Sequence, residues 1–274
     1  GEYVFITDDL YGDILVINIT NVQNPDLIKT YNLKINTYDI LIHNDKIYVT
    51  NGQHGISIFN LVNGKKLEFE ENLAIGPNVK KILIDEEHQY YLWDNGIKSE
   101  NNWELPLNEL NCDGKLCYLK QRYTTDFCMN EQYIFAAIYQ NDETFLIYII
   151  DKNYGSLTWK PLILDAKSIV LDAIPIDIEL YDNLLYVIKN NGELQIFDIS
   201  DINNIQDKIT ISIGTISKGD HEYLNRIQAD DDYVYVASMD EGVLIIDRDD
   251  YTNQLTFNFK GSELEGTSIY GFAI

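Results

Sequence analysis

Residues 176–200 read IDIELYDNLLYVIKNNGELQIFDIS, and this stretch decides the fold. It contains a short apolar segment (176–180), an Asp-Asn turn, a Leu-Tyr-Val-Ile segment (185–188), an Asn-Gly turn and an apolar segment that ends at Asp198. Alternation with a period of two, aromatic and β-branched residues, and Asn-Gly turns are typical of antiparallel strands joined by hairpins. The stretch therefore predicts three consecutive antiparallel strands.

The same unit recurs along the whole chain, and a polar turn and a fourth strand follow each copy. The copy from residue 79 is irregular up to Leu107. We expect the fourth strands at residues 27–31, 67–69, 157–159, 209–213 and 255–259. Repeats of four strands, stacked around an axis, form the blades of a β-propeller.

The two ends of the chain complete each other. The sequence opens directly on a second-strand pattern at residues 2–7, and a lone apolar strand pattern stands at residues 269–274. If this last strand pairs with the first, the ring closes and its exposed edges disappear. We therefore predict an all-β fold: a six-bladed β-propeller of four-stranded antiparallel blades, closed by the C-terminal strand completing the N-terminal blade.

The chain has 274 residues and no Pro/Gly/Ser-rich linker, so we expect a single domain. The predicted blades are 269–274 plus 1–33, 38–73, 79–121, 124–164, 174–213 and 225–259. Seven blades are the alternative if residues 98–117 hide a partial blade.

The composition is strongly acidic, with 44 Asp and Glu, 20 Lys and Arg, and a formal net charge of −24. Such a surface repels nucleic acid and anionic lipid, and it suits a basic partner or solubility. No apolar run approaches the ~20 residues of a membrane span. We therefore expect neither nucleic-acid binding nor membrane insertion, and the oligomeric state is left open.

The run ILVINITN at residues 14–21, with Asn24-Pro25 after it, resembles the LVIVD repeat of bacterial and archaeal β-propellers. The segments VLIID (243–247) and LQIFDIS (194–200) are similar to the same motif. The resemblance implies a propeller fold and an extracellular or cell-surface location. The start at Gly1, in place of Met, also indicates a processed or trimmed chain. No catalytic residue is implied.

Propellers bind ligands mostly on one rim or in the central channel, where loops from every blade converge. The front rim is defined here as the turns between second and third strands and the connections between blades. Candidate binding residues there are Asp8, Asp9, Tyr11, Tyr38, His54, Trp93, Tyr123, Tyr139, His221 and Tyr223. The alternative is that the aromatic residues pack between blades and the acids are solvated.

Four residues take similar positions in the first strands of their blades, near the channel: Asp39, Asp126, Asp177 and Arg226. Converging carboxylates could hold a cation or a cationic group. They could equally pair with Arg226, Lys80 or Lys81 and with backbone amides, and so fix the ring of strands. We favour this structural role.

Catalytic and metal motifs are absent from the sequence. The four His residues show no H-E-x-x-H spacing, and there is neither a nucleophile elbow nor a phosphate loop. The acidic run at residues 230–232 lacks the spacing of an EF-hand and falls where other blades place a turn, so no motif supports Ca²⁺. We expect no cofactor, no metal site and no catalytic residues.

Cys112 and Cys117 flank Asp113-Gly114, a hairpin-turn dipeptide. They could face each other and form a disulfide in an oxidising compartment, and two free thiols are the alternative. Cys128 stands in an apolar strand pattern and is expected in the core.

These observations predict a non-enzymatic binding module, a propeller whose rim docks a protein or a surface glycan. One alternative is a channel-centred hydrolase or lyase that uses carboxylates and His. It requires His54 or His221 within hydrogen-bond reach of two channel carboxylates. A second alternative is a structural spacer in a larger surface assembly, marked by an apolar patch on the outer strands.

Overall fold

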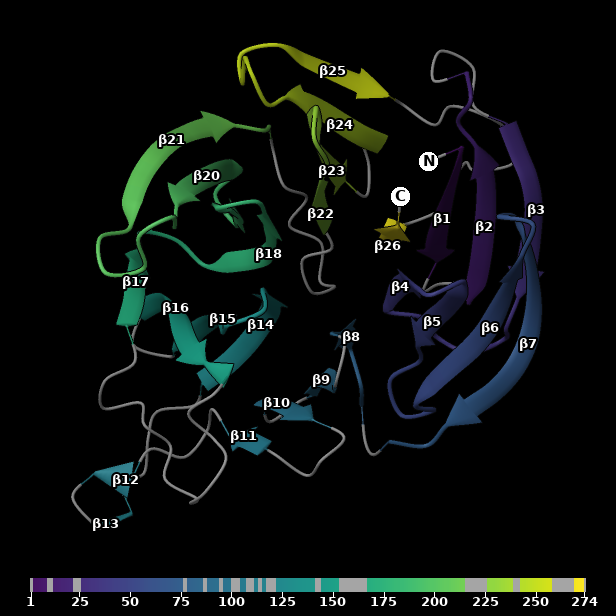
Figure 1. Cartoon of the computed structure of the whole chain (residues 1–274), viewed down its shortest axis with the longest axis horizontal. Coiled ribbons are helices and arrows are strands. Elements are labelled where there is room, and N and C mark those ends of the chain that lie inside the picture. The colour runs from purple at the N-terminus through teal and green to yellow at the C-terminus, as the bar shows by residue number, and fades with distance from the viewer. Residues whose placement is uncertain are drawn as a thin grey trace.

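The computed structural model describes residues 2–8, 12–21, 26–75, 78–85, 88–93, 96–99, 104–106, 111–112, 115–116, 122–140, 144–152, 167–214, 226–238, 242–257 and 269–273. Every named element among these residues is a β-strand. The strands form six four-stranded antiparallel sheets and one two-stranded hairpin. The six sheets are the blades of a β-propeller (Figure 1).

The first three blades contain the N-terminal half of the chain. Blade 1 consists of β26 (Ile269–Ala273), β1 (Tyr3–Asp8), β2 (Asp13–Asn18) and β3 (Asp26–Asn32). Blade 2 consists of β4 (Asp39–His43), β5 (Lys46–Thr50), β6 (Ile56–Val62) and β7 (Lys66–Leu73). Blade 3 consists of β8 (Lys81–Ile84), β9 (Gln89–Trp93), β10 (Gly96–Ser99) and β11 (Glu104–Pro106).

The other three blades follow in the same order. Blade 4 consists of β14 (Arg122–Met129), β15 (Tyr133–Gln140), β16 (Thr144–Asp151) and β17 (Lys167–Leu171). Blade 5 consists of β18 (Pro175–Tyr181), β19 (Leu184–Lys189), β20 (Glu193–Asp198) and β21 (Gln206–Ser212). Blade 6 consists of β22 (Arg226–Ala229), β23 (Tyr233–Ser238), β24 (Gly242–Asp247) and β25 (Gln254–Phe257).

Closure occurs between the two ends of the chain, as the sequence predicts. β26 pairs antiparallel with β1, with Phe5 opposite Ala273 and Thr7 opposite Gly271. Six strands, one from each blade, surround the central axis: β26, β4, β8, β14, β18 and β22 (Figure 1). The predicted six-bladed fold is therefore confirmed.

The predicted boundaries differ from the structure around blades 3 and 4. Residues 98–117 contain the end of β10, β11 and a hairpin of β12 (Asn111–Cys112) with β13 (Lys115–Leu116), which is not a seventh blade. The fourth strand of blade 4 is Lys167–Leu171, beyond the predicted limit at residue 164. The strand predicted at residues 157–159 lies outside the described residues.

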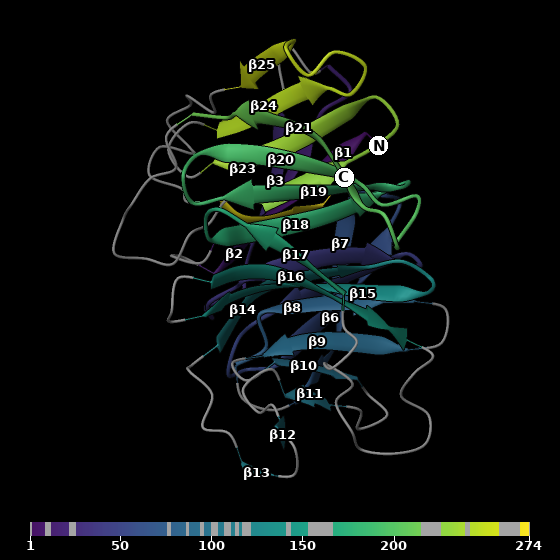
Figure 2. The same cartoon turned by 90° about the vertical axis from the view of Figure 1, so that its left-hand side faces the viewer.

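Apolar side chains hold neighbouring blades together. The strands run along the channel axis, which is horizontal in Figure 2, so each blade presents one sheet face to each neighbour. In β15, Phe135 and Ala137 contact the core shared with blade 5, whereas Ile134 and Ile138 contact the core shared with blade 3. Because residues of a strand alternate between its two faces, both faces must be apolar. This explains why the second and third strands read as nearly continuous apolar runs.

Glycine is required in the front-rim turns. At Gly192 the φ angle is +84° and an added Cβ would lie 2.2 Å from the carbonyl oxygen of Gly214. The Gly192 carbonyl also accepts the backbone N–H of Ile213 at 2.9 Å. The turn between the second and third strands therefore packs directly on the chain that leaves the fourth strand, and only glycine fits there.

Asx turns shape the opposite face, the back rim, defined as the turns between first and second and between third and fourth strands. The side chain of Asp198, at the end of the LQIFD strand, accepts the N–H of Ser200, and that of Asn18 accepts the N–H of Thr20. The residue after this Asp or Asn bonds to the turn between the first and second strands of the same blade. Ile199 N–H donates to Asn183 O, and Ile19 N–H donates to Glu2 O. The Asp or Asn at the end of the third strand is thus a turn-forming residue in blades 1, 5 and 6.

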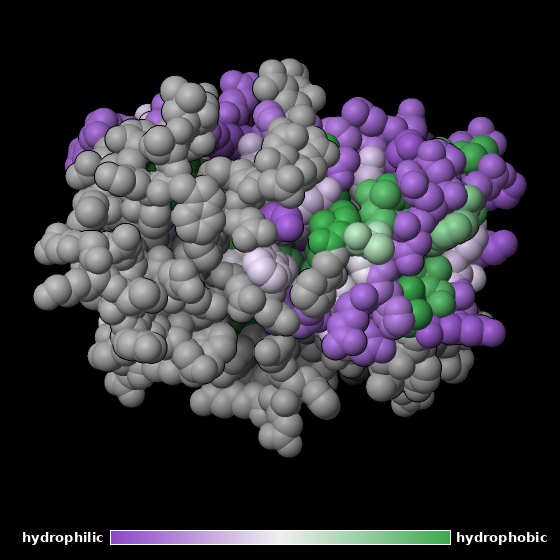
Figure 3. Space-filling view, turned by 90° about the horizontal axis from the view of Figure 1, so that it is seen from below, coloured by the Kyte–Doolittle hydropathy of each residue, from purple (hydrophilic) through white to green (hydrophobic). Residues whose placement is uncertain are grey.

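The outer strands carry bulges that disturb their free edges. The register of β3, β7 and β21 shifts opposite the same place in the third strand, and the extra residues are Ile28, Glu70 and Lys208. Bulged edges pair poorly with other chains. Large apolar side chains are exposed on four outer strands: Ile28, Phe69, Val170 and Leu255. Over blade 2, apolar residues lie among hydrophilic ones (Figure 3). No helix of the described residues is long and apolar enough to cross a membrane.

Candidate functional site

One position recurs in all six inner strands and forms a central ring. Its members face the second strand of their own blade at Thr50, Leu92, Ala137, Ile188, Ala237 and Thr7. The central ring consists of Asp39, Lys81, Asp126, Asp177, Arg226 and Gly271. The sequence pattern identified four of these residues at similar positions, and the structure brings them together. Lys81 was considered only as a counterion, because the irregular third copy hides its register.

Each of two ring aspartates holds the next blade through a backbone amide. The Asp126 carboxylate of blade 4 accepts the N–H of Ile178 in blade 5 at 2.9 Å. The Asp177 carboxylate of blade 5 accepts the N–H of Ile227 in blade 6 at 2.7 Å. In both cases the donor directly follows the ring residue of the next blade. A carboxylate at this position therefore binds the neighbouring inner strand in a fixed register.

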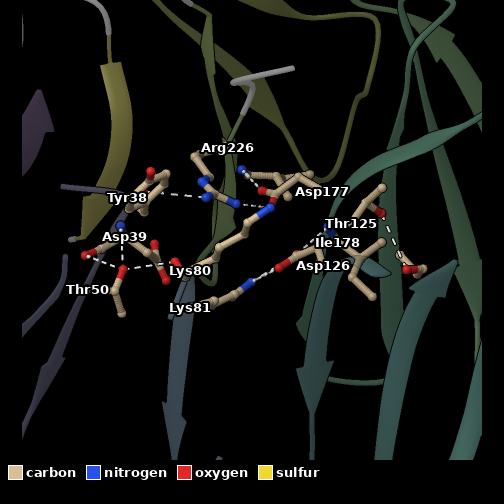
Figure 4. Close-up of polar contacts among 12 residues, drawn as sticks. Tyr38, Asp39, Thr50, Lys80, Lys81, Thr125, Asp126, Asp177, Ile178 and Arg226 are labelled. Atoms are coloured by element: carbon tan, nitrogen blue, oxygen red, sulfur yellow. Dashed lines mark hydrogen bonds and ion pairs between the residues drawn. The ribbon is translucent and has the colours of Figure 1, made fainter. Parts of the chain in front are cut away.

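The two ring cations pair with the same aspartates (Figure 4). Lys81 Nζ lies 2.8 Å from Oδ1 and 2.9 Å from Oδ2 of Asp126, and it joins blade 3 to blade 4. Arg226 Nη1 lies 2.9 Å from Asp177 Oδ1. The other terminal nitrogen of Arg226 donates to the carbonyl oxygen of Tyr38 in blade 2 at 3.5 Å. Arg226 therefore spans blade 1, where the ring position is Gly271 and offers no side chain.

Asp39 has a different environment. Its backbone N–H donates to Thr50 Oγ1 at 2.9 Å, and Thr50 Oγ1 donates to the carbonyl oxygen of Lys80 at 2.9 Å. The Lys80 side chain crosses the centre toward Asp177 in Figure 4. Thr7 takes the place of Thr50 in blade 1, and its buried hydroxyl has no hydrogen-bond partner.

Burial and charge act in opposite directions on these groups. Burial raises the pKa of Asp39 and of Asp126, although Arg226 and Lys81 lower both. Burial alone would lower the pKa of Lys81, but the carboxylates of Asp126, Asp177 and Asp39 raise it above its ordinary value. Lys81 and Arg226 therefore stay protonated and pair with the carboxylates of Asp126 and Asp177. Asp126 and Asp177 make the contacts expected of the structural role, pairing with cations and with backbone amides.

Glu179 is a channel residue that the sequence pattern did not single out. It stands two residues after Asp177 on β18 and is half-buried. Burial raises its pKa to about 8; Lys81 opposes this rise, and Asp177 and Asp39 reinforce it. No hydrogen bond or ion pair of its carboxyl group is found among the described residues. A glutamate in place of an apolar residue at an inner-strand position is the signal that could have identified it.

The front-rim candidates are only partly described. His54 is exposed in the turn between β5 and β6, and the ring of Tyr38 packs against Gly52 of the same turn. Tyr139 is half-buried and stacks on Phe145, with ring centroids 6.2 Å apart. Trp93 ends β9 and is half-buried. These four residues belong to blades 2, 3 and 4.

The other rim candidates are described by their backbone alone or lie outside the described residues. Asp8 and Tyr123 are described by their backbone alone, with Tyr123 opposite Tyr139 in the register of β14 and β15. The remaining candidates lie outside the described residues: Asp9, Tyr11, His221 and Tyr223. In the β12–β13 hairpin Cys112 is paired with Lys115, and Cys117 lies outside the described residues.

The acidic run at residues 230–232 forms a turn, as expected. Asp230 Oδ1 accepts the N–H groups of Asp232 and Tyr233 at 2.9 and 2.8 Å, and its Oδ2 accepts the Tyr235 hydroxyl. Within the described ranges, no group of three or more His, Cys, Asp or Glu side chains has a geometry suited to a metal ion. The carboxylate of Asp230 is used to shape the β22–β23 turn.

Comparison with known proteins identifies the architecture. No protein-family model matches the sequence, and no curated protein sequence matches it either. Among solved structures, apo AztD from Citrobacter koseri matches with a TM-score of 0.59 and 12% identity, over 99% of this chain and 97% of that chain. The computationally designed Ika8 protein matches with a TM-score of 0.55 and 11% identity, over 100% of this chain and 88% of that chain. At these identities the likeness shows the fold, and the chain is a six-bladed β-propeller.

Proposed function

We propose that this propeller is a non-enzymatic binding module that docks another protein or a surface glycan on its front rim. The observation that carries the proposal is that the charged side chains of the central ring bond to one another and to the backbone. Asp126 and Asp177 each bind a cation and a backbone amide of the next blade. These bonds make the ring a rigid frame, and a rigid frame that presents loops is suited to recognition.

The aromatic side chains of the front rim support the same proposal. The stacked pair Tyr139 and Phe145 lies at the front-rim end of blade 4, and the backbone of Tyr123 runs beside Tyr139. Exposed His54 lies on the front rim of blade 2. Partly exposed aromatic rings provide contact area at a low cost in side-chain entropy, and they stack on sugars or on apolar side chains. With a formal net charge of −24, the chain favours a basic protein over an acidic one.

The proposal is tested by comparing two matched variants with the wild-type propeller. The front-rim variant carries His54→Ala and Tyr139→Ala, and the back-rim control carries Glu131→Ala and Asp201→Ala. Each protein is immobilised and exposed to a glycan array and to total cell-surface extract. We expect one set of ligands to be retained by the wild type and the control, and lost by the front-rim variant. Equal retention by all three proteins contradicts docking on this rim.

A channel-centred hydrolase or lyase is the second candidate, and Glu179 is the observation that favours it. A carboxyl group with a pKa of about 8 is protonated at neutral pH and can act as a general acid. Of the two His residues that this alternative requires, His54 is exposed in the turn between β5 and β6, and His221 lies outside the described residues. A panel of chromogenic esters and glycosides, tested with the wild type and with Glu179→Gln, decides the matter. Turnover that Glu179→Gln abolishes supports the enzyme, and its absence in the wild type favours the binding module.

We further propose that the chain is related to the LVIVD-repeat propellers and works outside the cell or at its surface. The support is the repeated apolar strand that ends in an Asx turn, at Asn18, Asp198 and Asp247. The alternative of a structural spacer is supported by the large apolar side chains that are exposed on four separate outer strands. Expression with a fluorescent tag, followed by protease treatment of intact cells, tests the location.

A further inference from the structure

Asn-Gly pairs are chemically labile positions of a polypeptide, and this chain contains them at residues 51–52, 63–64, 95–96 and 191–192. The backbone nitrogen of the glycine can attack the amide carbon of the asparagine side chain, because glycine has no Cβ to hinder the approach. The attack needs a glycine N–H that no other group holds and an asparagine side chain that can turn toward it. The structure describes the pairs at 51–52, 63–64 and 191–192 fully, and they differ in these two respects.

The pair Asn51-Gly52, in the front-rim turn of blade 2, is held on both counts. The Gly52 N–H donates to the carbonyl oxygen of Val79 at 3.1 Å, and the Val79 N–H donates back to the Gly52 carbonyl oxygen. Asn51 is 1% exposed, and its Nδ2 donates to Ser57 Oγ at 2.7 Å. Ring closure at this pair must therefore break hydrogen bonds of both reacting groups in a buried turn.

The pair Asn191-Gly192, in the front-rim turn of blade 5, is held in the same way. The Gly192 N–H donates to the carbonyl oxygen of Lys189 at 3.1 Å, and Asn191 Nδ2 donates to Glu193 Oε2 at 2.8 Å. The Gly192 carbonyl oxygen also accepts the N–H of Ile213. The backbone of this turn therefore cannot rotate without losing its bond to the chain that leaves the fourth strand.

The pair Asn63-Gly64, in the back-rim turn between β6 and β7, lacks these restraints. Both residues are exposed, and no hydrogen bond of the Gly64 N–H or of the Asn63 side chain is found among the described residues. An added Cβ at Gly64 would meet no atom within 4 Å, so the turn has room to rearrange. The bond that closes the turn, from Lys65 N–H to the Val62 carbonyl oxygen, is long at 3.3 Å.

We propose that Asn63 is a site of spontaneous covalent modification, at which the folded chain converts asparagine into isoaspartate and aspartate. A base removes the N–H proton of Gly64, the nitrogen forms a bond to Cγ of Asn63, and the bond from Cγ to Nδ2 breaks as ammonia leaves. Water then adds to one carbonyl carbon of the resulting succinimide ring and breaks its bond to the ring nitrogen. Opening at the backbone carbonyl gives isoaspartate, and opening at the side-chain carbonyl gives aspartate.

The modification changes the back rim of blade 2 in two ways. It adds one negative charge next to Lys65 and Lys66 in the sequence. Isoaspartate also places an extra methylene group in the backbone of the turn, which alters the hairpin that joins β6 to the outer strand β7. The front-rim turns at 51–52 and 191–192, whose reacting groups are held, keep their covalent structure. The proposal depends on neither of the candidate functions above, because it requires no ligand.

Peptide mapping by mass spectrometry tests the proposal, because it separates the asparagine, aspartate and isoaspartate forms of each peptide. The native protein and the protein unfolded in urea are incubated side by side at 37 °C and pH 8 until the unfolded protein has reacted at all three sites. The unfolded protein gives the intrinsic rate of each site. We expect the ratio of native to unfolded rate to be at least about tenfold higher at Asn63 than at Asn51 or Asn191, since one or two hydrogen bonds must break first at those sites. A ratio at Asn63 no higher than at the other two sites overturns the proposal.

A variant of the turn separates the route through succinimide from direct hydrolysis of the side-chain amide. Gly64→Ala adds a Cβ that hinders attack by the backbone nitrogen, and the open space around it keeps the turn intact. Its matched control is Glu71→Ala, an exposed change on the same hairpin. We expect modification of Asn63 to slow severalfold in Gly64→Ala and to keep the wild-type rate in the control, with thermal unfolding showing that both variants fold. An unchanged rate in Gly64→Ala overturns the proposed route.

Discussion

At the scale of single residues, the ring aspartates do two things at once. Asp177, which is 1% exposed, accepts the Ile227 N–H with one oxygen and pairs with Arg226 through the other. Such pairs add little net stability relative to apolar residues, yet losing one partner is costly because a charge is left buried. Their physical role is therefore to fix the position of each inner strand relative to the next.

Replacing Asp177 with Ala should destabilise the protein by about 3–5 kcal/mol, because Arg226 keeps its charge without a partner and the Ile227 N–H loses its acceptor. Asp177→Asn should cost less, since its side-chain oxygen can still accept the amide. Urea unfolding measures both. The control is Glu68→Ala, which removes an exposed pair with Lys66 and should cost about 0.5 kcal/mol or less. Equal effects of Asp177→Ala and Glu68→Ala would show that the ring pair is dispensable.

Gly192 in a front-rim turn and Gly64 in the back-rim turn between β6 and β7 have similar backbone angles and allow a matched test. Gly64 has a φ of +70° and open space around an added Cβ, so Gly64→Ala should cost only the left-handed strain of about 1 kcal/mol. Gly192 has a φ of +84° and an added Cβ would lie 2.2 Å from Gly214 O. Gly192→Ala should therefore cost about 3 kcal/mol or more, since the backbone must also move. Similar thermal midpoints for the two variants would contradict this close approach.

At the scale of elements, the strands could be predicted and their connections could not. The period-two pattern with Asx and Gly turns located the repeat because each strand uses both faces, as Phe135 and Ile134 illustrate. The bulges in β3, β7 and β21 leave no trace in the sequence, since the extra residue is Ile28 in one blade and Glu70 in another. Lys81 was predicted as a partner of the ring aspartates, as observed, but its own place in the ring was not. Glu179 was missed, because its role depends on which side chains the ring brings across the channel.

A buried lysine connects three elements of blades 4 and 5. The Lys189 side chain, 2% exposed at the end of β19, pairs with Asp172 before β18 and with Glu193 in β20, at 2.7 and 2.8 Å. Hydrogen bonds from Lys189 lower the pKa of Asp172 and of Glu193. A lowered pKa contributes stability above the ordinary value, and this contribution disappears as the pH falls through the lowered value.

The stability of the wild type should therefore fall on acidification below about pH 4, where carboxylates normally titrate. In Lys189→Met this part of the acid dependence should be missing, because the carboxylates lose the donor that lowers their pKa. Urea midpoints at pH 7, 4 and 3 measure the difference, with Lys66→Met as an exposed control. Parallel acid profiles of Lys189→Met and the wild type would refute the assignment.

At the scale of the whole molecule, the ring is a closed chain of blade-to-blade contacts. In the described part of the chain six apolar clusters hold it, one at each interface between neighbouring blades. Closure needs β26, which brings the end of the chain beside β1. The sequence predicted this closure because the first blade lacks its first strand. Pairing the last strand of the chain with the first leaves neither of them with an unpaired inner edge.

Removing residues 269–274 should prevent closure, because it exposes the inner edge of β1 and leaves blades 6 and 2 without the strand between them. Size-exclusion chromatography should show self-association, and the cooperative thermal transition should broaden or vanish. A circular permutant that joins the two ends through a short linker and opens the chain at the exposed Gly64 turn is the control. It keeps every strand and should elute and melt like the wild type. A truncated chain that stays monomeric and cooperative would disprove the need for β26.

The pairing of β26 with β1 also has a consequence for synthesis on the ribosome. The two strands are separated by nearly the whole chain. The N-terminal sheet therefore lacks its first strand while the other five blades are translated. At typical elongation rates this interval is on the order of ten to fifty seconds. Nascent chains therefore carry an unprotected β-edge for far longer than a blade needs to fold, and a chaperone that covers extended segments would have its window of action there.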